Sequence, residues 1–524
     1  MESKNNAITK QFLSARAVST PIVAIETPDP GATRKRLITG VEGVCQKRQV
    51  AVASMFVWDA ASGMRPVNDE AQAVFGNMLE PFGGEQMATI QPQNALMVAA
   101  SSPDSSMTIM SNLHRFWEDA RLDPAVLQGI WNLRDQFKVS GRTLVLTMPD
   151  CTLPPELRND VVVLSEAMPT PDELRPVVVK IHENAGLPKP SASVLENATD
   201  ALAGLAMQQA EQVTAISLRK SGLDLESLRQ HQRQQIEQTP GLSIFSSDAA
   251  FDKLKGLGAL TKFLRGIIKG KRPPKAIVFI DEIEKMLAGA FGSQGDSSGT
   301  SQEQLGYFLQ HMQDENARGV LVLGPPGTGK SELAKATGNE GDCWTVGLDV
   351  GGMKGSLVGE SGAMTRRALN VIKALGQGDC FWIATCNSIE SLPPELRRRF
   401  SYGTWYVELP NADARKAMWK LYGEKYDVDP GSVADEGWTG AEIKTCVTMA
   451  ADMDTTVEET ARFITPVSRS SAESLARLRS LASGRFLDAS SGDFYQQSSK
   501  PVSTPEGMKQ IPKDAGRIFD MDES

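Results

Sequence analysis

Eight consecutive residues carry the pattern that is most informative about chemistry. They match G-x-x-x-x-G-K-[ST] and are Gly324, Pro325, Pro326, Gly327, Thr328, Gly329, Lys330 and Ser331. Glycines let backbone N–H groups surround a phosphate, the lysine charge suits the β- and γ-phosphate oxygens, and the serine hydroxyl is a Mg²⁺ ligand. The apolar run Val320–Leu323 predicts a buried strand before the pattern, and Glu332–Thr337 predicts a helix after it. The alternative is a chance glycine-rich turn, which would not require a strand before it and a helix after it. We therefore expect a site for ATP and Mg²⁺ that includes Glu332.

An acidic pair lies at the end of a second apolar run. Ile277–Ile280 predicts a buried strand, and Asp281 and Glu282 follow it directly. Carboxylates at the end of a buried strand cost free energy unless they meet a cation. We expect Asp281 to hold Mg²⁺ through water and Glu282 to polarise the attacking water. The alternative is an ordinary helix start, because Asp and Glu also favour first helical turns.

The composition restricts the class of protein. With 524 residues the chain is too long for one core, and we expect at least two domains. The net charge of −9 argues against non-specific nucleic-acid binding, which needs a basic face. The six cysteines form no CxxC pair and the four histidines lie far apart, so we expect no zinc site and reduced cysteines in a cytoplasmic protein. We expect neither a signal peptide nor a membrane span, because the first residues lack an apolar core and no apolar run is long enough to cross a bilayer.

Four segments resemble the AAA subfamily of AAA+ ATPases, which includes the proteasomal ATPases and FtsH. They are GPPGTGKSELAKA, VFIDEIEKML, IATCNSIESLPPELRRRF and GWTGAEIKTCVTMAA. The resemblance implies ATP hydrolysis, an α/β P-loop NTPase fold with parallel sheets and flanking helices, and a small helical lid. It implies that Asn387 orients water near the γ-phosphate, although alone this residue would be a turn residue. It also implies that Gly256 lies near adenine, and that Gly440 and Ala441 begin the sensor-2 helix.

The same resemblance covers two segments that act between subunits. Leu392–Phe400 matches the arginine-finger segment, in which we select Arg398 and Arg399. Such arginines reach a neighbour's γ-phosphate, so the resemblance implies a homo-oligomer, a hexameric ring. The segment lacks two residues that separate the arginines in the family, and a solvated basic turn is the alternative. Gly355–Ser361 resembles the pore loop, with Leu357 where the family has an aromatic residue.

The order of the motifs departs from this family. Asp281 and Glu282 precede Lys330, whereas the family has the phosphate loop (Walker A) before the acidic pair (Walker B). We interpret this as a permutation that moves the third strand of the module to the front. In a sheet of spatial order 5-1-4-3-2, right-handed crossovers can rebuild the same site from the permuted chain. The alternative is that the acidic pair belongs to another domain, but no second such pair lies between Ser331 and Asn387.

The N-terminal half reads as a degenerate copy of the same fold. The sequence LPPELR occurs at Leu153–Arg158 and again at Leu392–Arg397, each time after an apolar strand. The earlier copy has Ser111 and Asn112 where the acidic pair would stand, and this half has no GK[ST]. We therefore expect the fold without the ATP chemistry. The layout resembles the conserved-reading-frame AAA ATPases of plastids and cyanobacteria.

These observations predict six regions and one leading function. The regions are an N-terminal tail (1–19), a degenerate domain (20–185), a helical bridge (186–245), a large ATPase subdomain (246–410), a helical lid (411–465) and a mostly flexible C-terminal tail (466–524). The leading function is an oligomeric ATPase that remodels an unidentified protein substrate. A nucleic-acid motor or loader is the first alternative, although no basic stretch interleaved with aromatic residues supports it. An ATP-dependent scaffold or switch with slow turnover is the second.

Overall fold

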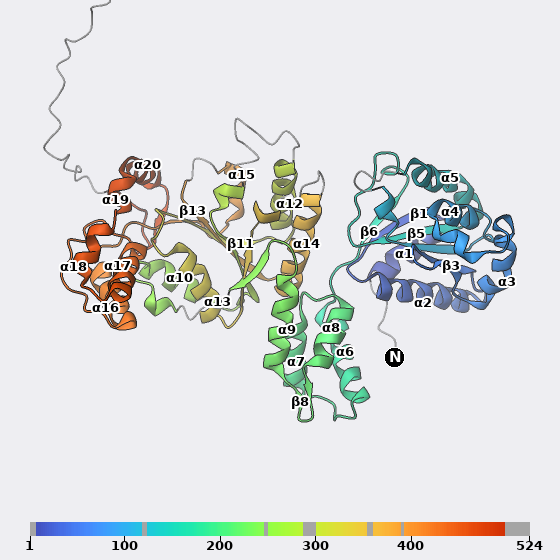
Figure 1. The fold of residues 1–524 in the computed structure, drawn as a ribbon, viewed down its shortest axis with the longest axis horizontal. Coiled ribbons are helices and arrows are strands. Elements are labelled where there is room, and N and C mark those ends of the chain that lie inside the picture. The colour runs from blue at the N-terminus through green and yellow to red at the C-terminus, as the bar shows by residue number, and fades with distance from the viewer. Residues whose placement is uncertain are drawn as a thin grey trace, which may run out of the picture.

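The computed structural model describes residues 7–117, 123–245, 250–286, 300–349, 351–353, 360–388 and 392–497. Two α/β sheets lie toward opposite ends of the long axis, and a group of helices lies between and below them (Figure 1). Short 3-10 helices occur in several connections: η1 (Glu80–Phe82), η2 (Gln86–Ile90), η3 (Leu113–Phe116), η5 (Phe251–Lys253), η6 (Gly351–Met353) and η8 (Ala461–Phe463). Among the described helices, none has the length and apolar character needed to cross a bilayer.

The N-terminal sheet has six strands in the order β3-β2-β4-β5-β1-β6, parallel except for β3. Its strands are β1 (Ile22–Glu26), β2 (Met55–Asp59), β3 (Gly63–Pro66), β4 (Met107–Ser111), β5 (Thr143–Met148) and β6 (Val162–Ser165). Its helices are α1 (Ala7–Ala17), α2 (Pro30–Arg48), α3 (Asp69–Met78), α4 (Pro92–Ala100) and α5 (Pro124–Ser140). The expected tail at 1–19 is wrong for residues 7–17, because α1 buries Phe12 completely in the same cluster as Val23 and Ile25.

A helical unit follows the first sheet. It contains α6 (Pro171–Asn184), α7 (Ala192–Leu202), α8 (Met207–Ile216) and α9 (Leu225–Glu237), with a hairpin of β7 (Leu218–Arg219) and β8 (Gly222–Leu223). The expected bridge at 186–245 needs two corrections. The unit already starts at α6, which packs on α7 and α8, and β9 (Leu242–Phe245) belongs to the next sheet. Its buried residues, among them Leu174 and Leu228, are continuous with the core of that sheet.

The second sheet has seven strands in the order β15-β14-β11-β13-β10-β12-β9, parallel except for β9. Its other strands are β10 (Ala276–Ile280), β11 (Arg318–Leu323), β12 (Trp344–Leu348), β13 (Cys380–Cys386), β14 (Thr404–Tyr406) and β15 (Leu487–Asp488). Its helices are α10 (Gly258–Ile268), α12 (Thr300–Asp314), α13 (Lys330–Glu340), α14 (Glu360–Leu375) and α15 (Pro394–Arg399). Because helices pack on both faces, β10 is buried throughout and β11 is buried after its first residue. The expected α/β class with parallel sheets and flanking helices is confirmed.

The two sheets share one spatial order but differ in chain order. The strands β6, β1, β5, β4, β2 and β3 occupy the same successive positions as β14, β11, β13, β10, β12 and β9. In the N-terminal sheet the central position after β5 is filled by β4, which follows β1 and β2 in the chain. In the second sheet that position is filled by β10, which precedes β11. The strand with the acidic pair therefore lies inside the sheet although it comes early in the chain.

A small helical lid follows β14. It contains α16 (Ala412–Tyr426), α17 (Gly440–Met453) and α18 (Val457–Thr460). The Asn411 side chain caps α16, and Thr439 and Glu442 form a capping box at α17. Its core contains Trp419 and Trp438, whose ring centroids are 6.0 Å apart.

The expected mostly flexible tail at 466–524 needs a correction for residues 466–497. This segment forms α19 (Val467–Ser470), α20 (Ala472–Ala482) and β15, which pairs in parallel with β14. Leu478 and Tyr495 are buried, and Arg479 donates two hydrogen bonds, of 2.9 and 2.8 Å, to Glu408. The serine-rich composition suggested disorder, but leucines at helical spacing supply an apolar face that packs into the hydrophobic core.

Because Leu478 is buried between α20 and the sheet, Leu478→Ala should lower the free energy of local opening there by about 2–5 kcal/mol. Hydrogen exchange measured on the full chain should become faster in α20 and β14. The exposed Ser480 on the same helix provides the control, and Ser480→Ala should leave exchange unchanged. Equal exchange in both variants would mean that residues 466–497 do not pack on the sheet.

Candidate nucleotide-binding site

The phosphate loop connects β11 to α13 and depends on glycine at three positions. Gly327 and Gly329 have φ values of 78° and 88°, in the left-handed region that favours glycine. At Gly324 a Cβ atom would lie 2.5 Å from the carbonyl oxygen of Val407. Thr328 is buried and donates to the Pro325 carbonyl at 2.8 Å, whereas Pro326 is exposed. The backbone geometry therefore requires the glycines that the sequence pattern supplies.

Lys330 is folded back onto this loop. It is only 6% exposed, and its Nζ donates to the carbonyl oxygens of Gly324 and Pro325 at 2.8 and 2.7 Å. Burial lowers the pKa of Lys330 to about 8, although the nearby carboxylates of Asp281 and Glu284 act in the opposite direction. Two carbonyl groups replace water around the Lys330 ammonium group. The charge is therefore already partly desolvated before a phosphate binds.

The acidic strand end meets this loop in space. Ser331 Oγ donates to the two carboxylate oxygens of Asp281 at 3.0 and 3.1 Å. Asn387 Nδ2 donates to Glu282 Oε1 at 2.8 Å. Lys285 forms a hydrogen-bonded ion pair with Glu282 Oε2, and this contact raises the pKa of Lys285. The structure thus brings together residues that are 50 to 105 positions apart in the chain.

Two further residues at this edge had no role in the sequence-based prediction. Thr385, on β13, hydrogen-bonds to Asp281 and to the backbone of Glu282. Glu284 accepts a 2.8 Å hydrogen bond from the backbone N–H of Asn387. A threonine inside an apolar strand and a second carboxylate two residues after Glu282 were the available signals, but neither indicates a partner without the fold.

The helical lid contacts the phosphate loop. The backbone N–H of Ala441 donates to the carbonyl oxygen of Gly327 at 3.1 Å. A Cβ atom on Gly327 would lie 2.9 Å from Thr439 Oγ1, so only glycine permits this approach. Gly440 lies at the same contact, and Gly256, with φ 85°, lies against Ala414 of α16.

The remaining predicted site residues lie elsewhere. Glu332 pairs with Lys335 at 3.1 Å on α13. In α15, Arg398 is exposed and Arg399 donates to Gln313 of α12 at 2.7 Å. A role for either arginine on a neighbouring copy stays a prediction. Leu357 of the expected pore loop lies outside the described residues.

The N-terminal sheet keeps the scaffold of this site without its carboxylates. At the end of β4, Asn112 has φ 58°, as Glu282 has φ 49° at the end of β10. Thr147 Oγ1 donates to Ser111 Oγ at 3.0 Å, where Thr385 donates to Asp281. Corresponding residues therefore hold corresponding positions, but Ser111 and Asn112 replace the acids.

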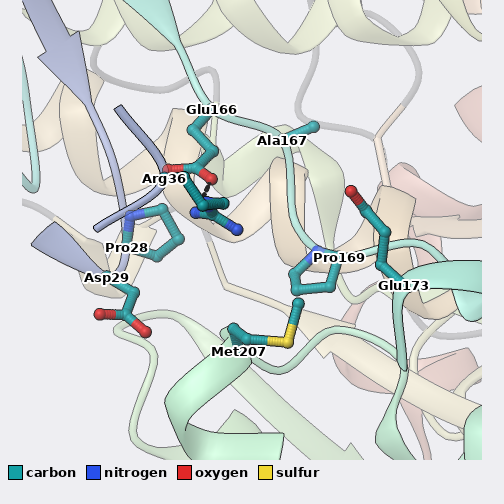
Figure 2. Close-up of a pocket in the computed structure, with 8 residues that line it drawn as sticks. All are labelled: Pro28, Asp29, Arg36, Glu166, Ala167, Pro169, Glu173 and Met207. Carbon is teal, nitrogen blue, oxygen red and sulfur yellow. Dashed lines mark hydrogen bonds and ion pairs between the residues drawn. The ribbon is translucent and has the colours of Figure 1, made fainter. Parts of the chain in front are cut away.

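In the N-terminal sheet, Asp29 lies at the place that corresponds to the phosphate loop, between β1 and α2. After β1, Asp29 Oδ1 accepts from the N–H of Ala32 in the first turn of α2 at 3.0 Å, and its Oδ2 accepts from the N–H of Gln208 in α8 at 3.2 Å. A helix N-terminus at this place is where an anion would bind, and a carboxylate already occupies it. Figure 2 shows Asp29 beside the ion pair of Arg36 and Glu166. The cavity there measures about 10 Å³, about the size of one water.

The mixed α/β fold, with parallel sheets and flanking helices, is consistent with the fold of AAA+ P-loop NTPases. Residues 9–166 match the family model of the SpoVK-like AAA ATPase N-terminal domain. The AAA domain-containing protein ycf46 of Guillardia theta is 23% identical over 390 residues, which are 64% of this chain and 69% of that protein. The ycf46 protein of Trieres chinensis is 23% identical over 465 residues, 78% of this chain and 85% of that protein.

A third relative matches a shorter part of the chain. The proteasome-activating nucleotidase of Sulfurisphaera tokodaii is 26% identical over 183 residues, 25% of this chain and 47% of that protein. The chain is thus similar to AAA ATPases along most of its length. The resemblance predicted from the motifs and the layout is confirmed at this level.

The lowered pKa of Lys330 leads to a pH dependence of ATP binding. A bound phosphate favours the charged lysine and raises its pKa, so binding at pH 9 should take up close to one proton and binding at pH 7 almost none. The affinity for ATP should fall about tenfold per pH unit above pH 8. Calorimetry in buffers of different ionisation enthalpy measures the proton uptake. In Lys330→Arg, whose guanidinium does not titrate in this range, the uptake should disappear. Proton uptake that is the same in both proteins would show that another group titrates.

Proposed function

We propose that this protein hydrolyses ATP at the site formed by the phosphate loop and the acidic strand end. The observation that carries the proposal is the 3.0 Å hydrogen bond from Ser331 to Asp281, which joins the two motifs in one place. A carboxylate and a hydroxyl are the oxygen ligands that Mg²⁺ prefers, so these two residues fit that ion. When bound, Mg²⁺ would neutralise charge on the β- and γ-phosphates.

Each of the other residues has a task in this proposal. The loop N–H groups and the Lys330 ammonium bind phosphate oxygens, with the lysine leaving the carbonyls of Gly324 and Pro325 for the nucleotide. Glu282 accepts the proton of the attacking water as general base. Asn387 shares a hydrogen bond with that carboxylate, so its amide is placed to hold the same water. Release of Lys285 from Glu282 frees the second carboxylate oxygen for this task.

The order of motifs is part of the proposal. We interpret the module as a permuted AAA module in which the Walker B strand, β10, comes before the Walker A strand, β11. Support comes from the sheet, where β10 has the position that β4 has in the N-terminal copy. Parallel strands present their carboxyl ends at one edge regardless of their order in the chain, so the same constellation can assemble.

We further propose that the protein works as a ring of identical subunits that remodels a protein substrate. In this assembly Arg398 and Arg399 would complete the site of the adjacent copy. The exposed position of Arg398 supports this role. The N-terminal domain, whose phosphate position holds Asp29, would act as a docking or structural part rather than as a second ATPase.

Glu282→Gln should keep ATP binding and lower kcat about 10²–10⁴-fold, because an amide cannot accept the proton. Fluorescent-nucleotide binding and steady-state phosphate release measure the two effects. The matched control is Asn112→Ala, at the corresponding position of the N-terminal sheet, which should leave kcat unchanged. Unchanged turnover in Glu282→Gln would disprove the assignment of the base and favour a nucleotide-dependent switch.

The double variant Arg398→Ala/Arg399→Ala should bind ATP but lose about 10³-fold or more of its turnover, because finger arginines stabilise transition-state charge. Mixing it with Lys330→Ala should restore some activity, since mixed assemblies contain boundaries with one intact site and one intact finger pair. Arg485→Ala, an exposed arginine elsewhere, is the control and should be fully active. If mixing restores nothing, the arginines do not act across a subunit boundary.

A further inference from the structure

We propose that Thr385 is a positioning residue that couples the metal-binding acid to the general base; this rests on the proposed ATP hydrolysis. Thr385 is fully buried on β13, the strand between β11 and β10. Its neighbours in the strand are almost all apolar, so a hydroxyl there costs free energy unless it is hydrogen-bonded. Among the described residues its hydroxyl has two hydrogen-bond partners, Asp281 and Glu282.

The two hydrogen bonds use the hydroxyl in opposite senses. Its oxygen donates to Asp281 Oδ1 at 2.5 Å and accepts from the backbone N–H of Glu282 at 2.9 Å. An ionised carboxylate can only accept, so the proton must point at Asp281 and a lone pair is left for Glu282. One side chain therefore holds the Asp281 carboxylate and the Glu282 backbone in a single arrangement.

The arrangement matters because the backbone of Glu282 has an unusual conformation. Its φ of 49° lies in the left-handed region, where residues other than glycine are uncommon and strained. This conformation places the Glu282 carboxylate within 2.8 Å of Asn387 Nδ2. Without the hydroxyl, the backbone can relax towards the right-handed region, which would turn the carboxylate away from Asn387.

The N-terminal sheet supplies an internal comparison. Asn112 has nearly the same backbone conformation, but its N–H donates to the backbone carbonyl of Thr147 at 2.8 Å. In that sheet the left-handed turn is held by the main chain, and the Thr147 hydroxyl contacts only the Ser111 hydroxyl in this cluster. In the ATPase sheet the corresponding N–H, that of Glu282, donates to the Thr385 side chain instead of to a backbone carbonyl. Removal of the hydroxyl should therefore release the turn in the ATPase sheet and leave the N-terminal one intact.

The test compares Thr385→Val with Thr385→Ser and Thr147→Val in the full-length chain. Thr385→Val keeps the shape and removes the hydroxyl, and we expect kcat to fall about 10–100-fold while KM for ATP changes less than about threefold. The Mg²⁺ concentration for half-maximal activity should rise, because Asp281 is no longer held. Thr385→Ser should recover most of kcat, and Thr147→Val should match the wild type.

Several results would overturn the proposal. Wild-type kcat in Thr385→Val, equal loss in Thr385→Ser, or a matching loss in Thr147→Val would each do so. If Thr385→Val does not fold, Thr385→Ser and Thr385→Ala form a second matched pair, since both lack the methyl group and only serine keeps the hydroxyl. A failure of ATP hydrolysis itself is distinguishable, because then the wild type would be inactive and Glu282→Gln would change nothing.

Discussion

The site depends on one constraint, which is the meeting of Ser331 with Asp281 at the carboxyl edge of a parallel sheet. The proposed Mg²⁺ site needs both residues, and the two lie 50 positions apart in the chain. Buried strands bring them together, since β11 and β10 flank β13 and all three end at the same edge. The strands run parallel because crossover connections join them, and the helices in those connections cover the two faces of the sheet.

This constraint explains how the proposed ATP site can form although the acidic pair precedes the phosphate loop in the chain. A sheet position is defined by its neighbours, and β10 pairs with β12 on one side and β13 on the other. In the N-terminal copy β4 pairs with β2 and β5 in the same way, although the chain reaches it by another route. Strand pairing and burial stabilise the sheet. The order of the strands in the chain changes only which loops connect them.

The N-terminal sheet has the corresponding strand order without the acidic pair or the G-x-x-x-x-G-K-[ST] pattern. The strand order and the left-handed turn at Asn112 remain, since they serve the fold. The anion position is filled by Asp29, which links α2 to α8 of the helical unit. At the same edge Asp150 faces Arg366 of α14, with the charged atoms 3.8 Å apart. At the edge that corresponds to the phosphate-loop edge of the second sheet, these two carboxylates attach the N-terminal sheet to the rest of the molecule.

The sequence by itself determined the local features. Glycines at fixed spacing, apolar runs and the residues that end them predicted the strands β10, β11 and β13, the phosphate loop and the repeated fold. These follow from backbone sterics and short-range periodicity, which operate within a few residues. Only the tertiary structure decided the packing of α1 and of residues 466–497, the link that Asp29 makes to α8, and the partners of Thr385. Each of these depends on contacts between distant segments, such as the 104 positions between Thr385 and Asp281, and no local pattern records which distant group will be near.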